Sequence, residues 1–172
     1  MKKQFYVLLS ACFLLTAAAC GKAPAPEDCA RQLLQEFYTV ADHESIEASL
    51  GAFETRATQS PWRAQYEALI SEAFLDEFCA NYVFDYSLAA YDGGYLVEAG
   101  DVALQETSSA EDPARRVYSY TLPLTVTFEY GASVTLNGSG VVSVVQTQTG
   151  VFLAESFQRT DRGAFHELAQ AG

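Results

Sequence analysis

The two histidines of this chain are its most obvious candidates for acid–base or metal chemistry. His43 is flanked by Asp42 and Glu44. Glu47 follows four residues later, so a carboxylate can share the helical face of the imidazole and support a general base or a weak metal site. The alternative, which we favour, is a polar helix junction in which Asp42 or His43 caps the next turn. We expect His166 to be exposed in a short helix near the carboxyl end.

Other patterns with catalytic potential lack the spacing that their chemistry needs. The stretch 137–140, Asn-Gly-Ser-Gly, is not the G-x-S-x-G of a nucleophile elbow and fits a bend or bulge within a strand better. The sequence contains neither a phosphate-binding glycine loop nor a Ser-x-x-Lys motif. Two cysteines without neighbouring histidines do not make a zinc site. We therefore predict no catalytic residue, no metal site and no cofactor.

The first nineteen residues have the pattern of a secretory signal. A positive start at residues 1–3 precedes the apolar run 5–15 and the small residues 16–19. The apolar run is too short for a transmembrane helix, which needs about 20 such residues. The pattern predicts export of the chain and removal of this leader.

The stretch 15–20, Leu-Thr-Ala-Ala-Ala-Cys, resembles the lipobox of bacterial lipoprotein precursors. The resemblance implies that the thiol of Cys20 is diacylglycerylated and that a peptidase cuts just before it. The mature protein would then be anchored by lipid to the extracytoplasmic face of a bacterial membrane. Ala17 stands where leucine is commonest in that motif. The three alanines also fit an ordinary A-x-A site, which would cut at the same bond and attach no lipid.

The number of cysteines bears on that choice. Cys12 leaves with the leader, so the mature chain keeps Cys20, Cys29 and Cys79. If Cys20 carries lipid, the other two form an even pair in an oxidising compartment. We expect Cys29 at the start of the first helix and Cys79 at the end of the second, where antiparallel packing would allow a disulfide worth roughly 4 kcal/mol. Two buried thiols are the alternative.

The charge balance excludes some partners. The chain has 22 acidic and 10 basic residues, and because Lys2 and Lys3 lie in the leader, the mature part carries a net charge of −14. Nucleic-acid binding needs clustered Lys and Arg, so we exclude it. Electrostatic adhesion to anionic lipid is excluded on the same ground, which leaves the lipid anchor as the link to the membrane.

Hydrophobic periodicity divides the remaining chain into helices followed by strands. We expect helices over about 28–41, over 44–50, and from the Ser60-Pro61 start signal to Cys79. After Ala80 the period changes from 3.6 to 2. We expect strands over 81–91, 95–105, 118–130, 133–147 and 151–159, with a hairpin turn at 92–94 and a short helix over 162–170.

This element order predicts the α+β class, with N-terminal helices packed on a curved antiparallel sheet of about five strands. We divide the chain into a signal peptide (1–19), a lipidated cysteine with a Pro/Ala tether (20–27) and one domain (28–172). By element order the domain resembles the nuclear-transport-factor-two-like, or cystatin-like, cone over roughly residues 28–159. That resemblance implies a bent sheet with a pocket at its wide end.

Aromatic residues could line such a pocket and offer hydroxyl groups to a small ligand. The candidates are Trp62, Tyr66, Tyr118, Tyr120 and Tyr130. The alternative is that they are ordinary core and strand formers. Asp85 is flanked by two aromatic residues, but it alternates with the apolar positions, so we expect it to face solvent.

Two functions remain distinguishable after these exclusions, and a third, an accessory protein in envelope assembly or secretion, has the same sequence features as the first. The first is a non-catalytic module that binds a small ligand or a protein partner outside the membrane. The alternative is a small enzyme of the isomerase or cyclase kind, which would need a titratable group inside an open cone. Val141, Val142, Val144 and Val145 make one strand apolar on both faces, as in a central strand that is covered on its far side. The resemblance to the cone superfamily, in which a second subunit often covers that side, implies a possible homodimer.

Overall fold

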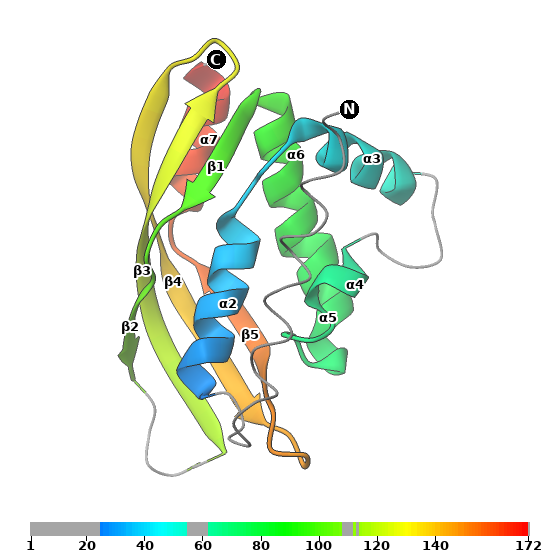
Figure 1. Ribbon diagram of the computed structural model, residues 1–172, viewed down its shortest axis with the longest axis vertical. Coiled ribbons are helices and arrows are strands. Elements are labelled where there is room, and N and C mark those ends of the chain that lie inside the picture. The colour runs from blue at the N-terminus through cyan, green and yellow to red at the C-terminus, as the bar shows by residue number, and fades with distance from the viewer. Residues whose placement is uncertain (1–24, 55–61, 108–111, 113, 172) are drawn as a thin grey trace, which may run out of the picture.

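A computed structural model describes residues 25–54, 62–107, 112 and 114–171 of the chain. Helices come first and strands later, with one further helix at the carboxyl end (Figure 1). The elements are α2 (Pro26–Tyr38), α3 (His43–Glu54), α4 (Arg63–Tyr66), α5 (Glu72–Phe78), the π-helical η2 (Cys79–Val83), α6 (Phe84–Asp92), β1 (Tyr95–Ala99), β2 (Ala103–Glu106), β3 (Arg115–Phe128), β4 (Ser133–Gln146), β5 (Phe152–Arg159) and α7 (Arg162–Ala171).

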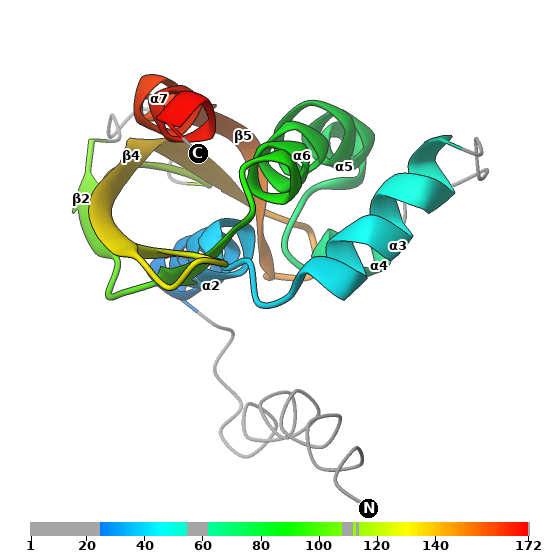
Figure 2. The same cartoon turned by 90° about the horizontal axis from the view of Figure 1, so that it is seen from above.

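The five strands form one antiparallel sheet that curls into a half-barrel (Figure 2). Its order is β1-β3-β4-β5. Strand β2 lies on the same edge of β3 as β1, where β1 pairs with residues 124–128 and β2 pairs with residues 118–121. The long hairpin of β3 and β4 is the centre of the sheet, with Tyr118 opposite Val142 and Val126 opposite Val134. The predicted α+β class and the curved five-stranded sheet are therefore confirmed.

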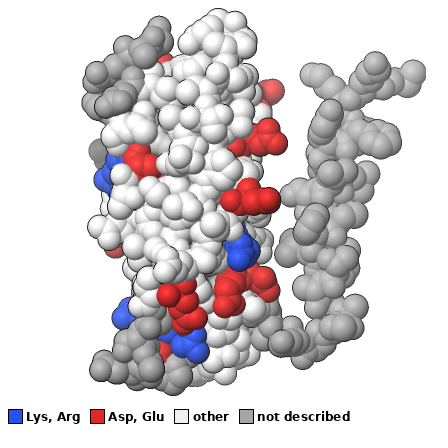
Figure 3. Space-filling model, turned by 90° about the vertical axis from the view of Figure 1, so that its left-hand side faces the viewer, with Lys and Arg blue, Asp and Glu red and all other residues white. Residues whose placement is uncertain are grey.

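Buried and exposed side chains alternate along β3, which shows which face of the sheet is buried. Tyr118, Tyr120 and Leu122 point into the concave side and are almost fully buried. The residues between them point outward, and Thr121, Thr125 and Thr127 are exposed. Much of this outer face is uncharged, and acidic groups outnumber basic ones on it (Figure 3).

The valines of β4 divide between the two faces as their positions predict. Val142 and Val144 are fully buried inside the sheet, while Val141 and Val145 are partly exposed outside it. Polar neighbours surround the outer pair: Ser143 donates to the Glu155 carboxylate on that face. Homodimerisation through this face stays a prediction, which light scattering of the mature protein can test.

Helix α2 fills the concave side of the sheet. Its buried residues recur at the helical period and include Ala30, Leu34 and Tyr38, each fully buried. Pro26 is in its first turn, and the Asp28 carboxylate accepts a hydrogen bond of 3.1 Å from the backbone N–H of Ala25. The predicted helix over 28–41 is thus confirmed, with both bounds a few residues earlier.

The predicted strand over 81–91 is wrong. Residues 72–92 form one helical run through α5, η2 and α6, and Cys79 lies inside it instead of at its end. The aromatic residues suggested a strand, but the buried set, including Phe74, Phe78, Tyr86 and Ala90, follows a helical spacing. The extra residue of the π-turn keeps that apolar face aligned with the core. The 92–94 turn consequently joins a helix to β1, and Gly94 has a φ of 58° there.

The predicted long helix ending at Cys79 is also interrupted. After the single turn of α4, Ile70 pairs with Ala154 of β5 in a parallel bridge. The Ser71 backbone N–H donates to the Ala154 carbonyl at 2.8 Å, and α5 starts afterwards. Ser60 and Pro61 lie outside the described residues.

The single strand expected over 95–105 is two strands, separated where the Gly100 N–H bonds to the Pro123 carbonyl at 2.9 Å.

Helix α7 lies against α6 at the open side of the half-barrel (Figure 2). Phe165 is its buried contact, 3% exposed. The predicted terminal helix is thereby confirmed. None of the helices in the described part of the chain combines the length and the apolar character that a membrane crossing requires.

Candidate functional site

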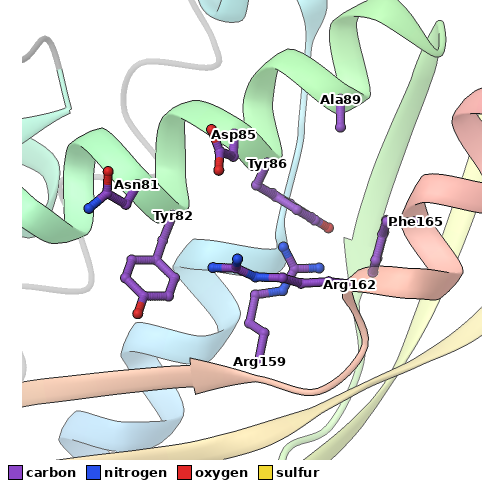
Figure 4. A pocket seen from close by; sticks show the side chains of 8 residues that line it. All are labelled: Asn81, Tyr82, Asp85, Tyr86, Ala89, Arg159, Arg162 and Phe165. Carbon is purple, nitrogen blue, oxygen red and sulfur yellow. The ribbon is translucent and has the colours of Figure 1, made fainter.

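A groove of about 320 Å³ opens between α6, the end of β5 and the start of α7 (Figure 4). Helix α6 with the preceding η2 supplies one wall, because Asn81, Asp85 and Ala89 recur every four residues along the same face. The complete lining is Asn81, Tyr82, Asp85, Tyr86, Ala89, Arg159, Arg162 and Phe165. Aromatic rings and two guanidinium groups thus face one another across this groove.

Arg159, the last residue of β5, lies at the base of the groove with its side chain only 6% exposed. Its guanidinium carbon lies 4.9 Å from the ring centre of Tyr86 and 5.1 Å from that of Phe165. Burial opposes the charge, but interactions with Tyr38 and Asp161 outweigh it and raise the pKa of Arg159 above the ordinary arginine value. Its Nη2 atom is buried and has no hydrogen-bond partner among the described residues.

Asp161 lies in the short link between β5 and α7, and its carboxylate neutralises the charge of Arg159. Its Oδ1 accepts a hydrogen bond of 2.8 Å from Arg159 Nε. Its Oδ2 accepts from the Tyr38 hydroxyl at 2.6 Å and from the Ser139 backbone N–H at 3.3 Å. The carboxylate is 2% exposed. These three donors all belong to the protein, so the acceptor capacity of Asp161 is largely used.

The two tyrosines beside Asp161 are held in their protonated form. The hydroxyls of Tyr38 and Tyr120 lie 3.0 Å apart, and because Tyr38 donates its single hydrogen to Asp161, Tyr120 donates to Tyr38. Burial is the main cause that raises the pKa of both phenols well above 10. The two phenols therefore help to position Arg159 and do not act as bases at neutral pH.

Arg162 and Asp85 stand at the rim of the groove, and both are exposed. The Arg162 guanidinium lies 5.5 Å from the ring centre of Tyr82. No carboxylate of the described residues lies within ion-pair distance of Arg162, although Asp85 lines the same groove. An exposed guanidinium without an ion-pair partner is notable in a chain with a net charge of −12.

A second hollow, of about 300 Å³, lies between α2, α3, α4 and α6. Trp62 and Tyr66 line it, and Asp42 is the charged residue among its lining. Asp42 Oδ1 accepts a hydrogen bond of 2.7 Å from the Ser45 backbone N–H, as an N-cap does. The interpretation of this junction as a helix cap is confirmed. The hollow offers no arrangement of acid and base.

The five aromatic residues predicted to line one pocket do not come together. Trp62 and Tyr66 line the second hollow, whereas Tyr118 and Tyr120 are 1% and 2% exposed inside the sheet. Tyr130 is 71% exposed, because it lies in the turn beyond β3 and stacks on Phe128 with ring centres 5.1 Å apart. The side chains of α2 fill the space that the predicted pocket would occupy.

His43 and Asp85, the histidine and the acidic residue considered in the sequence analysis, do not belong to a catalytic or metal-binding cluster of the described residues. His43 Nδ1 lies 3.0 Å from Glu129 Oε1, and its Nε2 lies 3.0 Å from the carbonyl oxygen of Tyr95. These contacts join α3 to the sheet. No three His, Cys, Asp or Glu side chains of the described part of the chain are grouped as metal ligands. Asp85 is exposed as expected, although on a helix and not on a strand.

Cys29 and Cys79 are both buried, and no disulfide joins them in the described structure. The thiol of Cys29 contacts the Leu69 carbonyl at 3.8 Å, and burial raises its pKa to about 11. The predicted position of Cys79 at a helix end is wrong, since the helical run continues past it. The disulfide stays a prediction for the exported, oxidised protein. Cys20 lies outside the described residues.

Sequence reasoning missed Arg159, Asp161 and Arg162. The available signal was the run Arg-Thr-Asp-Arg at 159–162, two cations around an acid where the last strand ends. In a strongly acidic chain such a run merits attention, but the run alone does not show that the first arginine is buried.

No protein-family model matches this chain, and none of the curated proteins compared with it does. Two solved structures are similar to it. One is the intermembrane space region of the chloroplast protein ARC6, 13% identical over 80% of this chain and 98% of that one, with a TM-score of 0.41. The other is Aln2 from a Streptomyces species, 17% identical over 83% of this chain and 98% of that one, with a TM-score of 0.39.

Proposed function

We propose that this protein is a lipid-anchored, extracytoplasmic binding module that takes a small ligand in the groove of Arg159 and Arg162. The observation that carries the binding role is the buried Nη2 of Arg159, which lacks an acceptor among the described residues. A buried donor without a partner costs about 1–3 kcal/mol, and a ligand that moves the surrounding rings aside and offers an acceptor would recover that energy. The groove is large enough for a small molecule.

The arrangement of the titratable groups favours binding over catalysis. An isomerase-like mechanism needs a carboxylate that can reach the substrate. Asp161 is the acid inside the half-barrel, and it already accepts hydrogen bonds from Tyr38, Arg159 and the Ser139 backbone. Asp85 is exposed at the rim of the groove. Neither carboxylate has the surroundings of a general base.

The anchor rests on the sequence pattern that ends at Cys20. Five residues, 21–25, separate Cys20 from the first residue of α2, and a tether of this length would keep the domain close to the membrane. Negative charge would keep the domain itself from adhering to anionic lipid. The lipid would supply attachment, and the groove would supply recognition.

The anchor is tested by mass spectrometry of the mature protein extracted from membranes. We expect an amino-terminal Cys20 that carries lipid, and a water-soluble product with an unmodified thiol would overturn this part of the proposal. The same measurement reports whether Cys29 and Cys79 are joined.

The binding role is tested with a small-molecule thermal-shift screen on the full mature protein in detergent. Ligands of the groove should raise Tm in the parent and in Arg115→Gln, a control on the outer face of the sheet. They should lose that effect in Arg162→Gln, which removes an exposed guanidinium without an ion-pair partner in the described structure. A screen whose hits all persist in Arg162→Gln would contradict the proposal.

A further inference from the structure

We propose that the groove selects a small monocarboxylate with a flat, apolar body, an inference that rests on the proposed binding function. Figure 4 shows the two guanidinium groups beneath α6, between the side chains of Tyr82 and Phe165. A planar carboxylate has two oxygens that can accept from both guanidinium groups at once. The geometry therefore fits an anionic head that bridges Arg159 and Arg162.

The donors in the groove are held ready for such a head. Arg159 cannot turn freely, because Asp161 fixes its Nε and aromatic rings surround its guanidinium. Its Nη2 is buried and has no acceptor among the described residues, so the carboxylate must move the neighbouring rings aside to reach it. Arg162 is exposed and held mainly by the ring of Tyr82, so it can shift toward an incoming anion with little loss. One arginine supplies a fixed donor and the other an adjustable one.

The charge of the groove favours one negative charge on the ligand over two. Asp161 already neutralises Arg159. Asp85, on α6, lines the same groove as Arg162. Arg162 is therefore the one groove cation that no described carboxylate pairs with, which suits a single negative charge, and Asp85 would repel a second negative charge at the rim. Phosphate monoesters and dicarboxylates are therefore disfavoured against a monocarboxylate.

The walls of the groove define the rest of the ligand. Tyr82 is the partly exposed ring of the lining, Tyr86 and Phe165 are each 3% exposed behind it, and Ala89 adds a small apolar side chain to the wall formed by α6. Flat apolar groups stack on such rings, and the burial of apolar surface adds to the charge interaction. A neutral molecule with the same body would keep the stacking and lose the contacts with the guanidinium groups.

The test measures binding of benzoate, phenyl phosphate and benzyl alcohol to the full mature protein in nonionic detergent, by ligand-observed NMR with empty micelles as the blank. We expect benzoate to bind at least tenfold more tightly than the other two. Arg162→Gln should weaken benzoate binding at least tenfold, and Arg115→Gln should leave it unchanged. Asp85→Asn should improve the binding of phenyl phosphate at least threefold, because it removes the repulsive charge.

The outcomes separate this inference from the binding function itself. If phenyl phosphate or benzyl alcohol binds as tightly as benzoate and Arg162→Gln still weakens that binding, the monocarboxylate class is wrong and the groove remains a binding site. If Asp85→Asn leaves phenyl phosphate binding unchanged, the charge argument is wrong. If benzoate binds equally to the parent and to Arg162→Gln, the groove is not its site, and the proposed function loses its support as well.

Discussion

The Nε atom of Arg159 donates to Oδ1 of Asp161 over 2.8 Å, and the two side chains are only 6% and 2% exposed. Removing one partner of a buried ion pair leaves the other charge without compensation. We expect Asp161→Asn to lower the free energy of unfolding by about 3–5 kcal/mol. Urea denaturation followed by circular dichroism measures this loss.

The surface pair of Arg63 and Asp76 provides the matched control. Its nitrogen–oxygen distance is 2.5 Å, but the Asp76 side chain is 84% exposed. Water and salt screen such a pair, so Asp76→Asn should cost less than about 1 kcal/mol. Similar losses in the two variants would show that Asp161 is not compensating a buried charge.

Two buried tyrosines, Tyr38 and Tyr95, allow the contribution of a hydroxyl hydrogen bond to stability to be measured apart from the contribution of the buried ring. Tyr38 donates to Asp161, whereas the hydroxyl of Tyr95 is buried and has no partner among the described residues. Tyr38→Phe should lower the free energy of unfolding by about 1.5–3 kcal/mol, because it removes a bond to a charged group. Tyr95→Phe should leave it unchanged or raise it by up to about 1 kcal/mol. Chemical denaturation of the two variants side by side tests the difference, and a larger loss in Tyr95→Phe would contradict the network.

Much of the fold could be predicted from the sequence because its strongest periodicities are local. The alternation along β3 and the helical period of α2 set both elements with small errors at their ends. The helical run 72–92 was harder, since its aromatic residues suit a strand and also repeat at helical spacing. Packing against the sheet decided between the two periods, and that packing is not visible in a short window of sequence.

The groove could not be predicted because its parts meet only in the folded chain. Asp161 and Tyr38 are 123 positions apart, and their contact determines how Arg159 is held. Burial of an arginine runs against composition rules, which place charged residues at the surface. Tyr130 shows the opposite error, because the alternating pattern extends two residues beyond the end of β3 and suggests burial where the side chain is exposed.

Glycines on β4 let the buried tyrosines approach the strand. A Cβ atom at Gly140 would collide with the Gln158 carbonyl oxygen and lie 2.7 Å from the Tyr120 hydroxyl. Gly140→Ala should therefore separate β4 from β5 and lower the free energy of unfolding by at least about 1–3 kcal/mol. Gly51, on α3, has open space around it, and Gly51→Ala should add about 0.5–1 kcal/mol instead. Thermal unfolding of the two variants checks the opposite signs, and equal stability of Gly140→Ala and the parent would refute the close approach.

The buried thiol of Cys29 predicts a loss of stability in alkali when the protein is reduced. Burial raises its pKa from an ordinary 9.0 to about 11, so the folded protein keeps a proton that the unfolded chain loses. The stabilisation is fully present below pH 9 and declines by roughly 2–3 kcal/mol as the pH rises through 11. Tyrosines with raised pKa values add their own decline, so the difference between the parent and Cys29→Ala in urea denaturation isolates the thiol. That difference should narrow between pH 8 and pH 11 under reducing conditions. If Cys29 is joined to Cys79, the oxidised parent should lack the share of the decline that belongs to the Cys29 thiol, because a disulfide sulfur does not titrate. A constant difference in the reduced protein would mean that the thiol is not shielded from water.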